Sequence, residues 1–431
     1  MKKILILLFV SLLIISNSNA ESFSSALSKA FKNNSELNAE RENINVSEQE
    51  LKISQGNYLP TLTLSGSKSQ EDTNKLTNQS GSNATINDVN PTTKSISISQ
   101  TLIDFGRGAE LSKSKIGLEL AKAKLLKKEQ DILYKTTEAY TGLVLANEKL
   151  NINKDNVELL NRQVETDQIR VERGLITLSD ASQSESSLAG AQANLIQAEN
   201  ELLTSKLNYE NIIGSLNDHK SLNKKSITVY PLPESLNSAI KLSKKNNPDL
   251  IIAQLEYEQA KRDKTIAKSD LAPTANLSLE RSYSDDLSAT YDEREKDTLK
   301  ATVTWPFYSG GKNLASLNKS SSLETRSRLI LDSVTKQNQT NVASAWSNYQ
   351  SNKSLLNSVQ AQVRAAEIAN EGIAAEYNSG AGRTTLEVIQ SNSLLLNAQI
   401  SLANSERNYI LSQFNLLKSI GLLHSEYLKI N

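Results

Sequence analysis

The sequence lacks most of the residues on which catalytic and metal sites depend. The 431-residue chain has no cysteine and only two histidines, His219 and His424. The absence of cysteine excludes disulfides and thiol chemistry, and the two histidines have no spacing that suits a metal site or a catalytic triad. Carboxylates are plentiful, but they lie among Lys and Arg on predicted helical faces, where solvated ion pairs are the common outcome. We therefore expect no enzyme activity, no metal and no cofactor.

The chain is also poor in apolar residues and has no excess of either charge. Its 48 basic residues are balanced by 48 acidic residues, so nothing in the charge indicates a nucleic-acid partner. Hydrophobic residues make up 38% of the chain and aromatic residues 5%, which is little material for a thick globular core. A thin, elongated structure is expected.

Long hydrophobic runs are absent after the first residues. The opening MKKILILLFVSLLIISNSNA has a basic start, a short apolar run and the small-x-small ending Ser18-Asn19-Ala20, which is the pattern of a secretory signal. We expect residues 1–20 to be cleaved, so that the mature chain begins at Glu21. The alternative is an uncleaved anchor helix, but the apolar run is short for a membrane span.

Proline is missing from two long windows, residues 92–230 and 307–431. Because proline is the residue that an α-helix interior tolerates least, these windows favour very long helices. If residues 109–173 and 312–378 are each one helix, a rise of 1.5 Å per residue makes them about 100 Å long. Apolar residues at heptad spacing indicate coiled-coil seams within the same windows: Leu188, Leu195, Leu202 and Tyr209, then Leu395, Leu402, Tyr409 and Leu416, with Ala191 and Ala198 inside the first set.

The chain repeats itself. LSKAFKNNSELN at residues 27–38 returns as IKLSKKNNPDLI at 240–251, which places Asn33 and Asn34 over Asn246 and Asn247. The correspondence continues to the last predicted helix of each half. We predict a first structural repeat at 21–214, a linker at 215–234 and a second repeat at 235–431.

Each repeat also contains two segments in which apolar and polar residues alternate. This period of two indicates strands with one apolar and one polar face, and predicts hairpins at 61–103 and 274–308. The polar stretches inside them, 70–94 and 285–298, are expected to be solvated loops. The alternating apolar residues are Leu62, Leu64, Ile96, Ile98, Leu102, Leu277, Leu279, Ala301, Val303 and Trp305.

The apolar face of such a sheet needs a cover, and the long helices are already used in their own seams. In a secreted chain the plausible cover is outer-membrane lipid. A lipid-facing sheet must close, because the backbone N–H and C=O groups of an open edge strand find no hydrogen-bond partner in hydrocarbon. Four strands cannot close around a pore. Several copies are therefore expected to share one barrel.

The order helix, hairpin, long helix, helix, given twice with QTLIDFGR, TWPFYSGGK, RGLITLSDASQSE, NYENIIG and SGAGRTTLEVIQ, resembles the TolC family of outer-membrane efflux and type I secretion channels. The resemblance covers essentially the whole mature chain. It implies a mainly α protomer whose long coiled coils form an α-helical barrel, and whose four antiparallel strands join a shared trimeric, twelve-stranded transmembrane β-barrel. It also implies a passive conduit across outer membrane and periplasm.

The same resemblance implies the partners: a homotrimer, outer-membrane lipid, a periplasmic adaptor protein, and an inner-membrane transporter that is ABC-type or proton-driven. The alternative is a structural or adhesive coiled-coil surface protein whose strands form a head domain.

Glycines occur at the predicted turns between strands and helices. Gly106, Gly108, Gly310 and Gly311 stand where a strand gives way to a helix, a change of direction that suits glycine at positive φ. The sequence SGGKN lacks the upstream glycine and the following Ser or Thr of a phosphate-binding loop. Nucleotide binding is therefore not expected.

The turns between long helices carry a second candidate site. Thr177 with Asp180 and Thr384 with Glu387 predict capping boxes. The resemblance implies that this tip is also the narrow, gated end of a tunnel, and Gln390, where some members have a second acid, suggests a less acidic ring. The candidate gate residues are Asp180, Tyr377, Arg383, Glu387 and Gln390, and the tip-turn glycines are Gly174, Gly380 and Gly382.

Overall fold

The structure, a computed structural model, describes residues 22–430 except 73, 76, 78–79, 83–87, 217–221, 223, 225–226, 228–229, 289–290 and 381. The predicted leader and His219 lie outside the described residues. The chain divides into two compact units. Unit 1 contains residues 1–38, 128–246 and 341–431, and unit 2 contains residues 39–127 and 247–340.

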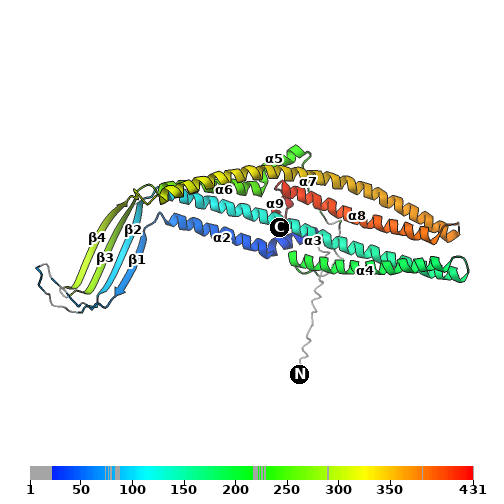
Figure 1. Ribbon diagram of the computed structural model, residues 1–431, viewed down its shortest axis with the longest axis horizontal. Coiled ribbons are helices and arrows are strands. Elements are labelled where there is room, and N and C mark those ends of the chain that lie inside the picture. The colour runs from blue at the N-terminus through cyan, green and yellow to red at the C-terminus, as the bar shows by residue number, and fades with distance from the viewer. Residues whose placement is uncertain are drawn as a thin grey trace, which may run out of the picture. The chain divides into compact units, whose positions relative to one another are not determined.

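The order of elements repeats along the chain (Figure 1). Two helices are followed by two strands and two more helices, and the same order then recurs. The first set is α1 (Phe23–Asn33), α2 (Ser35–Gly56), β1 (Thr61–Lys68), β2 (Thr92–Ile103), α3 (Arg107–Glu172) and α4 (Leu178–Ile212). The second set is α5 (Leu236–Asn246), α6 (Pro248–Ser269), β3 (Thr274–Ser288), β4 (Tyr291–Thr304), α7 (Lys312–Ser379) and α8 (Thr385–Ser419), followed by α9 (Ser425–Leu428).

The proline-free windows form the long helices that they predicted. Helix α3 has 66 residues and α7 has 68. The predicted seams are confirmed on the shorter partners, since Ala191, Ala198 and Tyr209 are buried along α4. On α8, Ala398 packs with Val363 and Ala366 of α7. Small residues at these positions allow the two helices of each hairpin to approach closely.

The repeated asparagine pair marks an interruption between two helices in each half. The side-chain oxygen of Asn34 accepts hydrogen bonds from the backbone N–H groups of Glu36 and Leu37, at 3.1 and 3.2 Å. Asn247 does the same for Asp249 and Leu250 at 2.9 and 3.4 Å. Asparagine is a preferred N-cap because its oxygen satisfies backbone donors that have no partner inside the helix. The sequence repeat therefore encodes a repeated break between helices.

Unit 1 has an aromatic core. The ring of Phe23 on α1 meets Tyr140 edge to face, with centroids 5.2 Å apart, and meets Phe414 of α8 at 5.5 Å. All three side chains are at most 2% exposed. Aromatic side chains bury large apolar areas, and edge-to-face geometry adds to that gain. These contacts attach the N-terminal helix to both long-helix hairpins of the unit.

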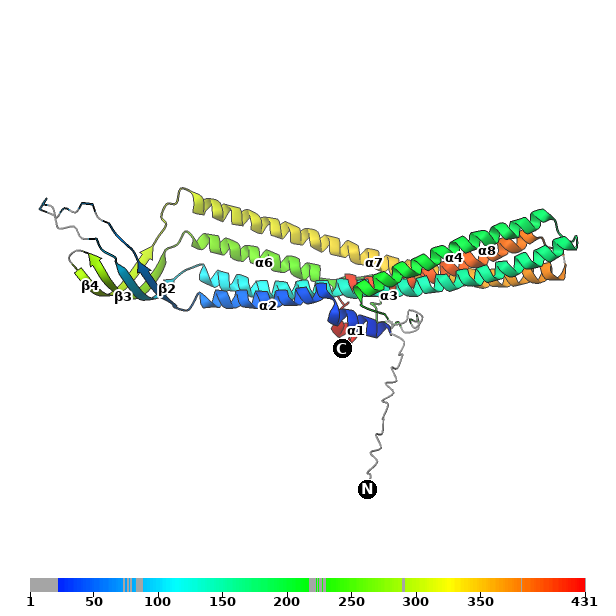
Figure 2. The same ribbon diagram turned by 90° about the horizontal axis from the view of Figure 1, so that it is seen from below.

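In unit 2 each strand adjoins one helix in the sequence. The sheet has the order β1-β2-β3-β4, with every neighbouring pair antiparallel. The helical segments that adjoin these strands lie side by side in the corresponding order α2, α3, α6, α7 (Figure 2). Ion pairs join α3 to α6, through Lys113 and Asp263 at 2.6 Å, and α6 to α7, through Lys264 and Glu324 at 2.8 Å.

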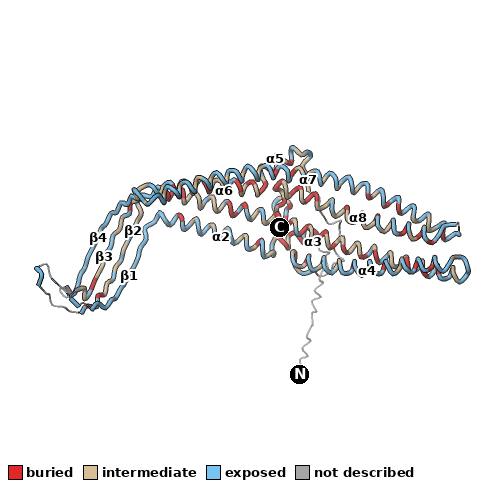
Figure 3. Tube along the Cα trace, viewed as in Figure 1, coloured by how far each residue is buried: buried red, intermediate tan, exposed pale blue. Residues whose placement is uncertain are grey.

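The second hairpin differs from the prediction. Residues 285–298, expected to be a solvated loop, belong almost entirely to β3 and β4, which have 15 and 14 residues. From Glu293 to Lys300 the charges of β4 alternate in sign, so its acidic and basic residues point to opposite faces there, while Asp292 shares the face of Arg294. The sheet is mostly exposed while burial concentrates along the helices (Figure 3). Because the strands are exposed, charge does not prevent them from pairing.

Within the described residues, no helix is both long enough and apolar enough to cross a membrane.

Candidate functional site

The turn between α3 and α4 is built as a glycine turn followed by a capping box. Gly174 has φ +71°, a conformation that L side chains rarely adopt. The hydroxyl of Thr177 accepts from the Asp180 N–H at 3.2 Å, and the Asp180 carboxylate accepts from the Thr177 N–H at 3.0 Å and from its hydroxyl at 2.7 Å. These hydrogen bonds, the hydroxyl bond first, hold the pKa of Asp180 below its usual value. The predicted capping box is confirmed.

The turn between α7 and α8 has the same design. Gly380 and Gly382 have φ +77° and +86°. Thr384 caps α8, and Glu387 accepts from the Thr384 N–H at 2.8 Å. The pKa of Glu387 is lowered, first by this backbone bond and then by its contact with Arg383. The glycines and capping residues therefore occupy equivalent places at both tips.

Arg383 binds two carboxylates of its own hairpin. Its Nε lies 2.6 Å from Glu376 and its Nη1 lies 2.9 Å from Glu387. Asp180 and Arg383 stand at equivalent tips of the two repeats, and their opposite charges suggest a link between neighbouring helices. Within one protomer Asp180 instead binds Thr177. A link between Asp180 and Arg383 of different copies stays a prediction. Gln390 is exposed on α8, about one turn after Glu387.

A buried carboxylate joins the two halves of the chain near the tips. Asp167 on α3 is 0% exposed. Its oxygens accept a hydrogen bond of 2.5 Å from the Ser184 hydroxyl on α4, one of 2.6 Å from the Tyr377 hydroxyl on α7, and bonds of 3.0 Å from Gln163. Tyr377 also lies 3.0 Å from the hydroxyl of Thr385 at the start of α8. The carboxylate thus connects α3, α4 and α7, and the Tyr377 hydroxyl extends the contact to α8. We call these five residues the Asp167 hub.

Arg170 completes the surroundings of Tyr377. Its guanidinium carbon lies 4.0 Å from the centroid of the Tyr377 ring, and its Nη2 donates to the Tyr377 carbonyl at 3.2 Å. Burial, followed by the bond to Asp167, raises the pKa of Tyr377, so its hydroxyl remains a donor at neutral pH. Cation–π contacts of this kind stabilise a ring in one orientation.

Of the hub residues, the sequence predicted only Tyr377. Asp167 follows Leu160 and Val164 at helical spacing, and all three are buried. Ser184 precedes Leu188 and Ala191 on the seam of α4 in the same way. A carboxylate and a hydroxyl at apolar positions of two facing helices were the signal that could have identified the hub, because buried polar groups need partners.

The strand-to-helix corners use glycine for two different reasons. Gly310 and Gly311 have φ +64° and +79°, which confirms the predicted use of positive φ. Gly106 and Gly108 do not have positive φ, so that expectation was wrong for them. A side chain on Gly106 would collide with the Ser269 hydroxyl, so close approach explains this glycine. Gly108 lies inside the first turn of α3, with open space around it.

The two faces of the sheet differ in chemistry, and strand register fixes their composition. One face carries the row Leu62, Ile98, Leu279 and Leu299. The neighbouring row on the opposite face is Thr61, Ser99, Ser278 and Lys300. Leu299 is 71% exposed and Val303 is 72% exposed. Large apolar side chains thus gather on one face without cover from the described residues.

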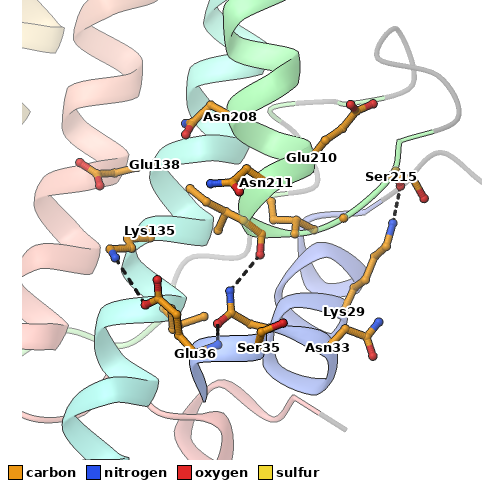
Figure 4. Close-up of a pocket in the computed structure, with 15 residues that line it drawn as sticks. Lys29, Asn33, Ser35, Glu36, Lys135, Glu138, Asn208, Glu210, Asn211 and Ser215 are labelled. Atoms are coloured by element: carbon orange, nitrogen blue, oxygen red, sulfur yellow. Dashed lines mark hydrogen bonds and ion pairs between the residues drawn. The ribbon is translucent and has the colours of Figure 1, made fainter. Parts of the chain in front are cut away.

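A polar pocket of about 800 Å³ lies where α1 and α2 meet α3 and the end of α4 (Figure 4). Asn34 spans its wall by donating to the Ile212 carbonyl at 3.3 Å, and Lys29 donates to the Ser215 carbonyl at 2.5 Å. Lys128, 2.6 Å from Glu36, lowers the pKa of that carboxylate. The wall is held by protein–protein contacts, so we assign the pocket a structural role. No group of three or more His, Asp or Glu side chains among the described residues is arranged for a metal ion.

Comparison with known proteins agrees with this architecture. A family profile described as outer membrane efflux protein matches residues 26–215 and 239–422. The outer membrane efflux protein BepC of Brucella suis is 25% identical over 412 residues, which cover 95% of this chain and 87% of BepC. The outer membrane protein TolC of Escherichia coli K12 is 23% identical, covering 78% of this chain and 71% of TolC.

A solved structure has the same fold. The CmeC outer membrane channel of Campylobacter jejuni superposes with a TM-score of 0.81 at 17% identity, over 94% of this chain and 88% of CmeC. The profile match extends over both helix–strand–helix sets, from α1 to the end of α8. The chain therefore belongs to the outer membrane efflux protein family and acts at the outer membrane in export.

Proposed function

We propose that three copies of this chain form one passive exit duct, in which their sheets close a twelve-stranded barrel and their long helices continue the conduit into the periplasm. The observation that supports it best is the two-faced sheet. An apolar face that no described element covers suits lipid, while a face of hydroxyl and charged groups suits a water-filled lumen.

The sheet edges support closure by further copies. In the described sheet, β1 and β4 each pair on one side only. Unpaired backbone groups cost several kcal/mol each in hydrocarbon, so a lipid-facing edge must find a partner strand. Pairing of β4 in one copy with β1 in the next would satisfy both edges and close the ring. Membership of the family supports three as the number of copies.

The partners follow from the passive character of such a duct. The sequence predicts no nucleotide-binding or metal-binding site, and a passive duct would need its energy from elsewhere. A periplasmic adaptor and an inner-membrane transporter, either ABC-type or proton-driven, would supply it in an efflux pump or a type I secretion system. The tips of the helical hairpins are the end that such partners would meet and open.

We propose that the tips form the gate. Asp180, Arg383, Glu387 and Gln390 lie at or close to the two turns, and Tyr377 ties α7 to α3 through the Asp167 hub. Capping boxes fix where α4 and α8 begin, so opening would require whole hairpins to move. The contacts of Arg383 with Glu376 and Glu387 would stiffen the α7–α8 turn in the closed state.

A structural or adhesive surface protein is the competing proposal. It needs no lipid-facing strands and no conductance. Purified protein reconstituted in planar bilayers separates the two: discrete channel openings from a detergent-stable trimer support the duct. A stable protein that remains in solution without detergent and never conducts would favour the adhesin.

A further inference from the structure

The polar face of the sheet carries cations in one strand and hydroxyl groups in the others. Register places four rows on this face. Twelve of their sixteen side chains are Ser or Thr hydroxyls, and the charged exceptions are Glu280 on β3 with Arg294, Lys296 and Lys300 on β4. The rows are Thr61–Ser99–Ser278–Lys300, Thr63–Ser97–Glu280–Thr298, Ser65–Ser95–Ser282–Lys296 and Ser67–Thr93–Ser284–Arg294.

Hydrogen bonds across the sheet fix this face. The hydroxyls of Ser65 and Ser95 lie 2.8 Å apart on paired strands, and those of Thr93 and Ser284 lie 3.1 Å apart. Successive residues of a strand point to opposite faces, so Arg294, Lys296 and Lys300 all share the face of these hydroxyls. From Arg294 to Lys300 they span six residue steps of β4, or about 20 Å at the usual rise of an antiparallel strand.

From Glu293 to Lys300 the charges of β4 are sorted by sign between the two faces, while Asp292 shares the face of Arg294. Its sequence YDEREKDTLK puts Glu293, Glu295 and Asp297 on the apolar face. There Arg281 lies 3.4 Å from Glu295 and 3.8 Å from Asp297, so charge is met by opposite charge. Among the residues that the structure describes, no carboxylate lies within ion-pair distance of Arg294, Lys296 or Lys300. All three are exposed.

We propose that Arg294, Lys296 and Lys300 give the outer-membrane part of the duct a preference for anionic solutes. The inference rests on the proposed function, because it needs this face to line the lumen. With Arg294, Lys296 and Lys300 set against Glu280 and Asp292, this face carries a net charge of +1 per copy, which three copies raise to +3. Fixed charge in a low-dielectric wall concentrates counter-ions near it.

At the tips Arg383 binds both Glu376 and Glu387, Asp180 binds Thr177, and Gln390 is uncharged. These tip residues are the same in the wild type and in the sheet variants below, so a difference between them reports the sheet alone. Screening limits the reach of the wall charges, since the Debye length is about 8 Å at physiological ionic strength and about 3 Å at 1 M salt. The preference for anions should therefore be strong in dilute salt and fade in concentrated salt. Solutes with carboxylate, phosphate or sulfate groups are the class that the wall favours.

The test is ion selectivity in planar bilayers under a tenfold KCl gradient. The test variant combines Arg294→Gln, Lys296→Gln and Lys300→Gln. The control variant combines Lys68→Gln, Lys94→Gln and Arg281→Gln, which removes the same charge from the same sheet but from its other face. We expect chloride to be favoured over potassium in the wild type and in the control. In the test variant the reversal potential should move toward the potassium equilibrium value.

The release of charged dyes from proteoliposomes is a second measurement of the same preference. Proteoliposomes should release an anionic dye faster than a cationic dye of equal size, and only the test variant should lose the difference. Equal reversal potentials in the wild type and the test variant, or equal shifts in both variants, would overturn the inference. Either result requires conducting trimers, so it leaves the proposed duct standing, whereas failure of the wild type to conduct would refute the duct itself.

Discussion

The hydroxyl of Tyr377 donates a 2.6 Å hydrogen bond to the buried carboxylate of Asp167, and this bond joins α7 of the second half to α3 of the first. Both side chains are at most 4% exposed. A hydrogen bond to a charged group that water cannot replace is among the stronger contacts in a protein. The two hairpins of one copy are thus held together near the tips by a bond between side chains 210 residues apart.

Tyr377→Phe should loosen the tips. The substitution keeps the ring and its contact with Arg170 but leaves Asp167 with fewer donors, at a cost of about 1–3 kcal/mol. We expect faster hydrogen exchange at the α3–α4 and α7–α8 turns and longer open times in bilayers. Tyr308→Phe is the control, because that ring is 84% exposed. Unchanged exchange at both turns would show that the hub does not secure them.

Asp167→Asn tests whether the hydrogen bond between Tyr377 and Asp167 is what secures the tips. If Asp167 and Tyr377 act together, the double variant should lose less than the sum of the two single losses, because the Tyr377–Asp167 bond is counted in both. Thermal unfolding of detergent-solubilised trimers measures the three variants. Fully additive losses would assign the two residues separate roles.

Arg383→Ala should raise conductance, because it frees Glu376 and Glu387 at the narrow end. Asp180→Ala distinguishes the two possible partners of Arg383. If copies are linked through Asp180 and Arg383, both variants should open the channel to large antibiotics, and the exchange Asp180→Arg with Arg383→Asp should restore closure. If only Arg383→Ala opens it, the contacts within one hairpin are the gate. High salt should reduce either effect, since exposed ion pairs are screened.

The faces of the barrel can be tested with neighbouring residues. Arg at Leu277 or Val303 would place a cation against lipid, which costs about 2–4 kcal/mol at the bilayer midplane. Thr302→Arg would point the same side chain to the opposite face and should assemble normally. The yield of heat-resistant trimers in outer-membrane fractions is the measurement. Equal yields from all three variants would contradict the assignment of Leu277 and Val303 to the lipid-facing side of the sheet.

Lys224 offers a test of the linker between the halves. Its ammonium lies 2.5 Å from Glu148 on α3 and also binds Glu406 on α8. Burial alone would lower its pKa, but the hydrogen bonds to the two carboxylates outweigh burial and raise it. The stabilisation is therefore complete below the ordinary lysine pKa of 10.5 and disappears as the pH rises through the higher folded value.

Lys224→Met should cost about 1–3 kcal/mol of stability at neutral pH, because two carboxylates then face each other without a cation. The loss should shrink at strongly alkaline pH, where the wild type also loses the charge. Lys206→Met, which removes only a surface pair with Glu210 at 4.0 Å, is the control. A melting temperature that falls equally for both variants would show that the linker contact has no special role.

Most of the fold could be predicted from the sequence, because the patterns that specify it lie within long continuous stretches of the chain. Two proline-free windows predicted α3 and α7, and heptads such as Ala191 and Ala198 predicted the seams. The asparagine pair predicted a repeat, and its side-chain bonds explain why the pair recurs. The hairpin at 274–308 was predicted, but its residues 285–298 were expected to be a loop because charged residues are rare in buried strands, whereas β4 is exposed.

The candidate site was predicted only in part. Capping boxes depend on residues three positions apart, so Thr177 with Asp180 and Thr384 with Glu387 were readable from sequence. The Asp167 hub depends on four helices that meet only in the folded chain. The corner glycines show the same limit: positive φ at Gly310 is a local property, while the close approach at Gly106 depends on the distant Ser269.

Trimeric closure of the barrel is tested most directly by pairing cysteines across the predicted seam between copies. The chain has no native cysteine, so one residue each on β1 and β4, such as Thr63→Cys with Thr302→Cys, introduces the only thiols. Oxidation in outer membranes should produce a ladder of dimers and covalent trimers, and neither single variant should yield trimers. A doubly substituted protein that remains monomeric for every β1–β4 pairing along the two edges would contradict a barrel shared by three copies.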